Sequence, residues 1–150
     1  MDPPMASEAG RWTAMTTTEA TGTFRGVSWD EAPYSEIEGG PKLTHAHVTN
    51  TYEGDITGES VVDYVMVYPG SISVFAGYER ITGTIGERTG SFVLRHDGTF
   101  ENGVVQTKWT VVPGSGTGDL VGLIGNGSYI AKHEVPDTPF TLTYSFEGDA

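Results

Sequence analysis

From Thr18 onward, apolar and polar residues alternate in segments that end at glycine, proline or asparagine. Alternation with a period of two is typical of β-strands that bury one face. The pattern predicts eight strands, at residues 20–29, 42–53, 59–68, 71–84, 89–100, 104–112, 119–131 and 139–147. Between them, Pro69-Gly70 and Asn102-Gly103 predict tight hairpin turns, and the polar segment 30–41 predicts a longer loop.

No segment repeats with the period of an α-helix, so no helix is available to cover a sheet. Eight antiparallel strands with short connections then bury their apolar face by closing on themselves. Glycine, at 21 of 150 residues, fits the turns and bulges that such a fold needs. We therefore predict an all-β protein, an eight-stranded antiparallel up-and-down barrel with an apolar lumen.

One face of the predicted strands is apolar, and we assign it to the lumen. It consists of Val48, Asn50, Tyr52, Val62, Tyr64, Met66, Tyr68, Phe75, Gly77, Glu79, Ile81, Phe92, Leu94, His96, Thr107, Trp109, Val111, Phe140, Leu142, Tyr144 and Phe146. The first strand is ambiguous, because Gly26 is a candidate β-bulge that turns Phe24, Trp29 or both inward. The opposite face holds mainly polar residues, such as His45, His47 and Asp63, and is assigned to solvent.

The predicted turns also bring polar side chains together inside the lumen. A hairpin turn fixes the register of its two strands, so cross-strand neighbours follow from each turn. Turns at 102–103, 86–89, 69–70 and 54–58 predict one row of neighbours that crosses five strands: Trp109, His96, Glu79, Ser60 and Tyr52. A slip of one residue at 86–89 would move Glu79 to the other face.

A carboxylate inside an apolar barrel is costly unless it is paired, and a histidine directly opposite is a suitable partner. One interpretation of Glu79 and His96 is an acid–base dyad in a hydrophobic cavity. Burial would raise the pKa of Glu79 and lower that of His96, while their mutual attraction acts the other way. The other interpretation is a structural pair that closes one end of the barrel, bonded to a tyrosine hydroxyl and water.

The amino-acid composition argues against several classes of binding partner. The chain has 20 acidic and 8 basic residues, a net charge of −12, which argues against nucleic acid and anionic membranes. It has no cysteine, so it has no disulfide and no thiolate metal site. It shows no bilayer-spanning apolar run and no secretory signal, so we expect a cytoplasmic protein. Residues 1–17 lack periodicity and predict a disordered or loosely attached extension before a single domain at 18–150.

Three other motifs have simpler explanations than a site. The glycine-rich block 114–119 is followed by no lysine and no helix, so it predicts a turn rather than a phosphate loop. His45 and His47 share a face but have no third metal ligand beside them. Asp30, Glu31 and the acidic residues after them predict a solvated loop, since no calcium-loop signature is present. We therefore expect no metal and no cofactor.

Several short stretches carry a family resemblance: Gly22-Thr23-Phe24 and then Trp29-Asp30-Glu31, followed by Gly77–Gly83, Gly90–Phe100 and Trp109–Leu120. Together they resemble an uncharacterised family of small bacterial proteins with the allene oxide cyclase-like β-barrel, which the dirigent proteins share. The resemblance covers about residues 18–147. It implies an eight-stranded barrel with an apolar cavity, and chemistry that comes mainly from folding a flexible substrate into a reactive shape.

Glu79, His96 and Trp109 match positions of the family pattern, but the family has no settled reaction from which a catalytic role follows. Gly26 departs from the pattern, because an aliphatic residue is more usual there. The departure implies a wider lumen near the first strand, or a shifted register.

Our leading hypothesis is a cofactor-independent isomerase or cyclase that acts on a small, largely apolar metabolite. Glu79 would be the acid–base residue, and His96 would orient it or exchange protons with it. The predicted substrate-binding residues are Trp29, Tyr52, Tyr64, Met66, Phe75, Phe92, Leu94, Trp109 and Tyr144.

Two alternatives need no chemistry. The first is a binding or carrier protein for a hydrophobic small molecule, and the second is a barrel that side chains simply fill. Outward-facing valines at 61, 65, 67, 74, 93, 104 and 112 form either a homo-oligomer interface or an ordinary strand surface.

Overall fold

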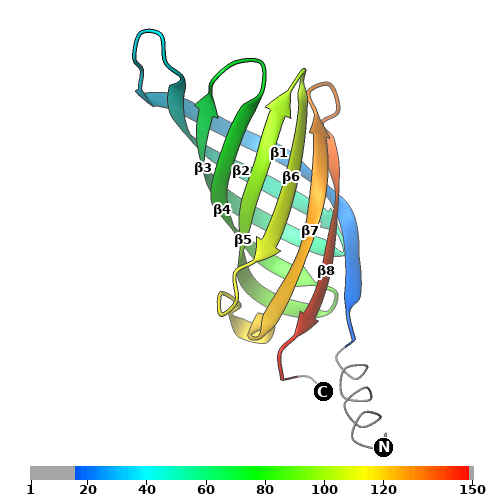
Figure 1. Ribbon diagram of the computed structural model, residues 1–150. Coiled ribbons are helices and arrows are strands. Elements are labelled where there is room, and N and C mark those ends of the chain that lie inside the picture. Colours follow the sequence, from blue (N-terminus) through cyan, green and yellow to red (C-terminus); the bar gives the residue numbers. More distant parts are fainter. Residues whose placement is uncertain (1–15, 149–150) are drawn as a thin grey trace, which may run out of the picture.

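The computed structural model describes residues 16–148, which form a closed barrel in which each strand pairs with its neighbours in sequence (Figure 1). The strands are β1 (Thr18–Ser35), β2 (Lys42–Gly54), β3 (Ile56–Tyr68), β4 (Ser73–Ile85), β5 (Arg88–Glu101), β6 (Val104–Val111), β7 (Leu123–Lys132) and β8 (Asp137–Phe146). The first and last strands pair from Thr18↔Tyr144 to Arg25↔Asp137, which closes the barrel. The predicted all-β, eight-stranded antiparallel barrel is confirmed. Of the predicted extension, residues 1–15 lie outside the described part.

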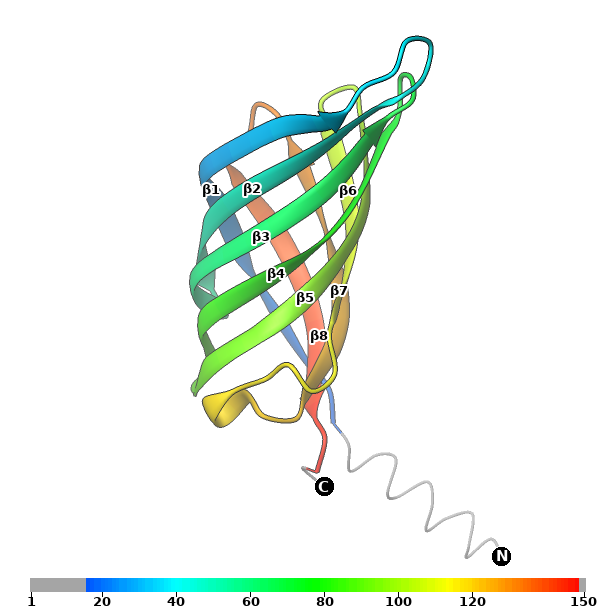
Figure 2. The ribbon, with the colours of Figure 1, turned by 90° about the vertical axis from the view of Figure 1, so that its left-hand side faces the viewer.

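Two strand boundaries differ from the prediction by four residues or more, and the others differ by less. β1 continues to Ser35, through part of the predicted loop 30–41, because these residues pair with β2 up to Ser35↔Leu43. Beyond Arg25 the strand has lost its β8 partner, so Pro33 lies on an edge where a missing N–H is tolerated. Figure 2 shows the resulting β1–β2 hairpin extending beyond the other connections at that end of the barrel, which we call the upper end. β7 begins at Leu123 rather than 119, after the short 3-10 helix η1 (Gly118–Leu120).

The strand register corrects three of the four predicted pairings. His96 does lie opposite Trp109, as the Asn102-Gly103 turn predicts. However, His96 pairs with Gly77, Glu79 pairs with Leu94 on one side and Val62 on the other, and Ser60 pairs with Asn50. Each of these pairings is shifted by two residues, because the connecting turns differ in length from the prediction. The β2–β3 and β4–β5 turns are shorter than predicted, and the β3–β4 turn is longer. Because the shift is an even number of residues, each side chain stays on its predicted face of the sheet, and the assignment of the lumen face is correct.

The bulge predicted near Gly26 is present. Gly26 pairs with Asn50 and Ser28 pairs with Thr49, which leaves Val27 as the extra residue in β1. The extra residue reverses the alternation, so Phe24 and Trp29 both lie on the lumen side. Phe24 packs against the core. Trp29 is exposed at the rim of the upper end, and its ring lies 6.0 Å from the ring of the buried Tyr64.

The lower half of the barrel is filled with side chains. Ile56, Ile85, Leu120 and Leu123 are fully buried there. The connection between β6 and β7 crosses this end (Figure 2), where the hydroxyls of Ser91 and Thr117 lie 2.7 Å apart. A side chain at Gly116 would collide with the Leu120 carbonyl oxygen, so glycine lets the connection fold tightly over the opening. The glycine-rich block is thus a closing turn of the barrel.

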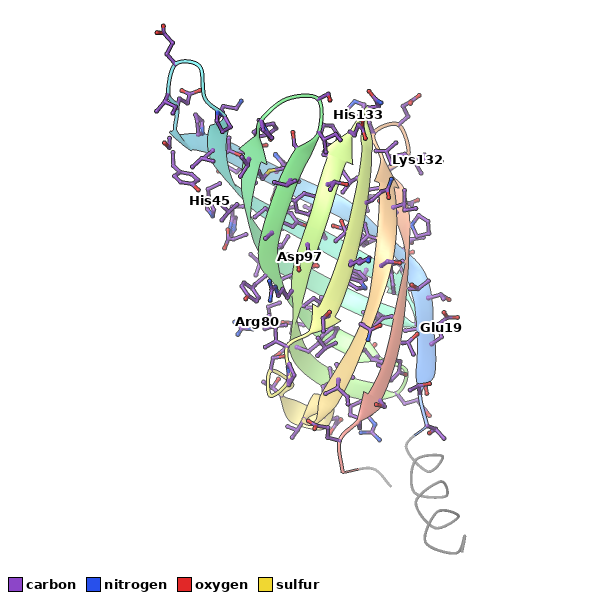
Figure 3. All side chains as sticks on the ribbon, in the orientation of Figure 1. Glu19, His45, Arg80, Asp97, Lys132 and His133 are labelled. Carbon is purple, nitrogen blue, oxygen red and sulfur yellow. The ribbon has the colours of Figure 1, made fainter. Side chains whose placement is uncertain are left out.

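The outer face is mainly polar, as the pattern predicts, and the outward-facing Val61, Val65 and Val74 are exposed on it. His45 and Arg80 point away from the barrel in Figure 3, and Asp97 is also exposed. His45 and His47 both approach Asp63, at 3.2 and 2.8 Å, but within residues 16–148 no group of three or more such side chains is arranged to hold a metal ion. Among the same residues, no helix is long and apolar enough to cross a membrane.

Candidate functional site

A buried carboxylate lies at the centre of the lumen. Glu79 on β4 is fully buried, and its Oε2 accepts hydrogen bonds from Ser60 (2.5 Å), Tyr52 (2.8 Å) and Asn50 (3.3 Å). Its Oε1 lies 2.7 Å from Nε2 of His96, which is 1% exposed. The predicted proximity of Tyr52, Ser60, Glu79 and His96 is therefore present, although their strand pairing differs. Trp109 instead donates its indole N–H to the Thr141 carbonyl and contacts His96 through its ring.

These contacts set the charge of Glu79. Burial pushes its pKa upward, but the hydrogen bond and charge of His96, together with hydrogen bonds from Ser60 and Tyr52, outweigh burial and lower the pKa below 4.5. Glu79 is therefore ionised at neutral pH. Because an ionised carboxylate only accepts hydrogen bonds, Nε2 of His96 carries a hydrogen and donates it to Glu79.

The other ring nitrogen of His96 faces a tyrosine hydroxyl on the side of the upper half of the barrel. Nδ1 lies 3.3 Å from the hydroxyl of Tyr129 on β7, and that hydroxyl lies 3.5 Å from the hydroxyl of Tyr64. Burial raises the pKa of Tyr129 to about 12, so the phenol is protonated at neutral pH. Glu79, His96 and Tyr129 thus form a carboxylate–imidazole–hydroxyl chain, which has the order of groups found in catalytic triads.

The upper half of the barrel contains a pocket of about 500 Å³ above this chain. Seven aromatic side chains line it: Phe24, Trp29, Tyr64, Tyr68, Phe75, Phe100 and Tyr129. Aliphatic residues, among them Val48, Met66 and Ala131, complete most of the wall. Trp29 is 56% exposed at the rim, whereas Asn50, Tyr64 and Tyr129 are buried. A pocket of this size and lining is typical of a binding site for a small apolar molecule.

The predicted substrate-binding residues divide between the two halves. Trp29, Tyr64, Met66 and Phe75 line the pocket. The other five are not among its lining residues: Tyr52, Phe92, Leu94, Trp109 and Tyr144. Phe92, Leu94 and Trp109 belong to the filled part of the core. The two predicted catalytic residues, Glu79 and His96, also do not line the pocket, but they contact residues that do: Glu79 is hydrogen-bonded to Asn50, and His96 lies beside Tyr129 and Tyr64.

Sequence reasoning gave no role to Tyr129, Asn50 or Glu31. Asn50 was on the predicted lumen face, but an amide alone carries no signal of its target. Tyr129 alternates with Gly127 and Ala131, and that alternation would have placed its hydroxyl in the lumen. Glu31 lies on a strand at the pocket rim rather than in a solvated loop, because β1 is longer than predicted.

Comparisons with known proteins identify a family. The family model described as "Protein of unknown function (DUF3224)" matches residues 20–144. A crystal structure of a protein of unknown function from the same family, from Shewanella oneidensis MR-1, superposes with a TM-score of 0.73 at 25% identity. The match covers 88% of this chain and 99% of that one. No curated protein matches the chain. The chain, an eight-stranded barrel with a buried Glu79–His96 pair beneath an aromatic pocket, therefore belongs to the DUF3224 family.

Proposed function

We propose that this protein binds a small, largely apolar molecule in the upper pocket. The observation that carries this proposal is the asymmetry of the barrel, in which the lower half is filled and the upper half holds a pocket of about 500 Å³ lined by aromatic rings. Burial of apolar surface supplies the affinity, at about 25 cal/mol per Å² before the costs of association. Asn50, Tyr64 and Tyr129 supply the polar groups that would fix the orientation of the ligand.

A second candidate, cofactor-independent isomerisation or cyclisation of that ligand, is favoured by the chain from Tyr129 to Glu79. In this proposal His96 starts with a hydrogen on Nε2 alone, so its Nδ1 accepts the hydroxyl proton of Tyr129, and the Tyr129 oxygen then takes a proton from a carbon beside a ligand carbonyl. Glu79 stabilises the imidazolium that forms. The Tyr64 hydroxyl donates to the carbonyl oxygen as negative charge develops there. The proton then returns at a different carbon, so the product is an isomer and no oxidant or cofactor is consumed.

The resemblance to allene oxide cyclase-like barrels supports the same pair of candidates. An apolar cavity that holds a flexible molecule in one conformation can direct its rearrangement by proximity alone. In that view Glu79 and His96 position Tyr129, since neither lines the pocket.

Ligand binding is tested by narrowing the pocket. A Cβ at Gly26 would meet only the Asn50 Oδ1, at 3.7 Å, so Gly26→Leu is expected to project into the pocket without disturbing the backbone. For the wild type, an apolar probe such as decanol at a hundredfold excess over Kd is expected to stabilise the fold by about 2.7 kcal/mol. We expect Gly26→Leu to keep its melting temperature without decanol and to lose most of the shift with it. An equal shift in both proteins would place the ligand elsewhere.

Turnover is tested with a small-molecule extract of the native host, incubated with the protein and compared by mass spectrometry. Conversion of a compound to an isomer of equal mass supports the enzyme. A compound that the protein removes from solution and releases unchanged supports the carrier.

A further inference from the structure

The upper pocket has one charged side chain among the described residues that line it, Glu31 on β1. Its Oε1 accepts a hydrogen bond from the Trp29 indole N–H at 2.9 Å. Its Oε2 accepts from Thr44 at 2.6 Å and from the Tyr68 hydroxyl. These donors hold the carboxylate at the rim in one orientation. Oε1 has the capacity to accept a further donor, which a ligand can supply.

Aromatic rings surround the same position. Tyr68 and Trp29 donate to Glu31, and the Trp29 ring lies 6.0 Å from that of Tyr64. Faces of tyrosine and tryptophan rings attract cations placed within about 6 Å of their centres. A carboxylate beside several such rings is the arrangement that recognises an organic ammonium group.

Charges outside the pocket include some that favour the binding of a cation and one that opposes it. The chain carries a net charge of −12, which attracts cations to its surface. Lys42 is the nearby opposing charge, and its Nζ lies 4.8 Å from the centre of the Tyr68 ring. The side chain is not among those that line the pocket, so it reduces the negative potential at the rim without blocking the space beside Glu31.

We propose that the ligand of the upper pocket is an organic cation, with an ammonium group held at the rim by Glu31 and an apolar body held among the aromatic rings beneath it. This inference rests on the proposed binding function and adds the charge of the ligand to it.

Three probes with one hydrocarbon chain and different head groups test the inference by isothermal titration calorimetry: decylammonium, decanol and decanoate. At pH 7 the amine and the acid are both charged. We expect the wild type to bind decylammonium about tenfold more tightly than decanoate, with decanol between them. Glu31→Gln is expected to remove this preference while decanol still binds, which also shows that the variant is folded.

Two further variants separate charge from structure. Lys42→Met should enlarge the preference for decylammonium, since it removes the opposing charge. Glu87→Gln, which removes an exposed carboxylate in the turn at the lower end, should leave the preference unchanged. If the wild type binds decanol but does not distinguish the charged probes, or if the preference persists in Glu31→Gln, the inference is wrong and the binding function stands. If none of the three probes binds, both are wrong.

Discussion

Replacing Glu79 by alanine is expected to destabilise the fold by about 3–5 kcal/mol, because it leaves the partners of a buried carboxylate without an acceptor. Ser60, Tyr52, Asn50 and His96 all direct hydrogen bonds to Glu79, and all are buried. Glu79→Gln retains an oxygen acceptor but loses the charge, so we expect a smaller loss, of about 1–3 kcal/mol. Urea denaturation of the three proteins measures both values.

The effect of Glu79 also depends on pH in a defined direction. Its pKa in the folded protein lies below the ordinary value of 4.5, so the unfolded state binds the proton more readily. The stabilisation is therefore complete above about pH 4.5 and disappears as the pH falls through the lowered pKa. The difference in stability between wild type and Glu79→Gln should shrink below that pH and stay constant above it.

Glu59→Ala is the matched control, because Glu59 lies on the same barrel wall with its side chain exposed. It should change stability by no more than about 0.5 kcal/mol. A Glu79→Ala variant as stable as Glu59→Ala would show that the hydrogen bonds to Glu79 do not hold the fold.

The largest expected effect on turnover comes from Tyr129→Phe. In the proposed isomerisation Tyr129 is the group that exchanges a proton with the ligand, and general acid–base catalysis contributes about 10²- to 10⁴-fold. We expect kcat to fall by at least about 10²-fold. Stability should fall by only about 1 kcal/mol, because the hydrogen bonds of the hydroxyl are long, at 3.3 and 3.5 Å. The readout is the rate of isomer formation from the compound that the wild type converts.

Tyr144→Phe removes a hydroxyl of the last strand at a residue that does not line the pocket, and it should retain full turnover. Decanol affinity, measured on all three proteins, shows whether the pocket is intact. Undiminished turnover in Tyr129→Phe would remove this residue from the mechanism and leave the carrier as the better candidate.

The barrel was predictable because its signal repeats in every strand. Alternation in eight segments specifies a two-faced sheet, and a face assignment tolerates any even error in register. That is why Glu79, His96, Ser60 and Tyr52 were correctly expected to lie together, although three of the four predicted pairings are shifted by two residues. The error in register came from the predicted turn lengths. The residues of the turn at Gly86-Glu87 differ little in composition from the strand residues beside them, so the sequence does not mark where the turn ends.

The pocket was less predictable than the core. Whether eight strands enclose a filled or a hollow lumen depends on how side chains from opposite walls meet, and alternation carries no information about that. The lower half is filled in part by Leu120, which lies in the β6–β7 connection. The upper half is open where β1 has its bulge at Val27 and where Gly26 has no side chain. The resemblance pointed to Gly26 as unusual, whereas nothing in the sequence placed Glu31 on the pocket rim.

The most direct test of the upper pocket uses the two tryptophans of the described residues as reporters, one at the pocket and one in the filled core. Trp29 lies at the rim and donates its indole N–H to Glu31, whereas Trp109 is fully buried and donates to the Thr141 carbonyl. The measurement is a decanol titration followed by proton–nitrogen NMR, with the indole signals assigned from Trp29→Phe and Trp109→Phe. We expect the Trp29 signal to shift with a saturable dependence on decanol while the Trp109 signal stays in place. An unchanged Trp29 signal at saturating decanol would contradict the proposed site.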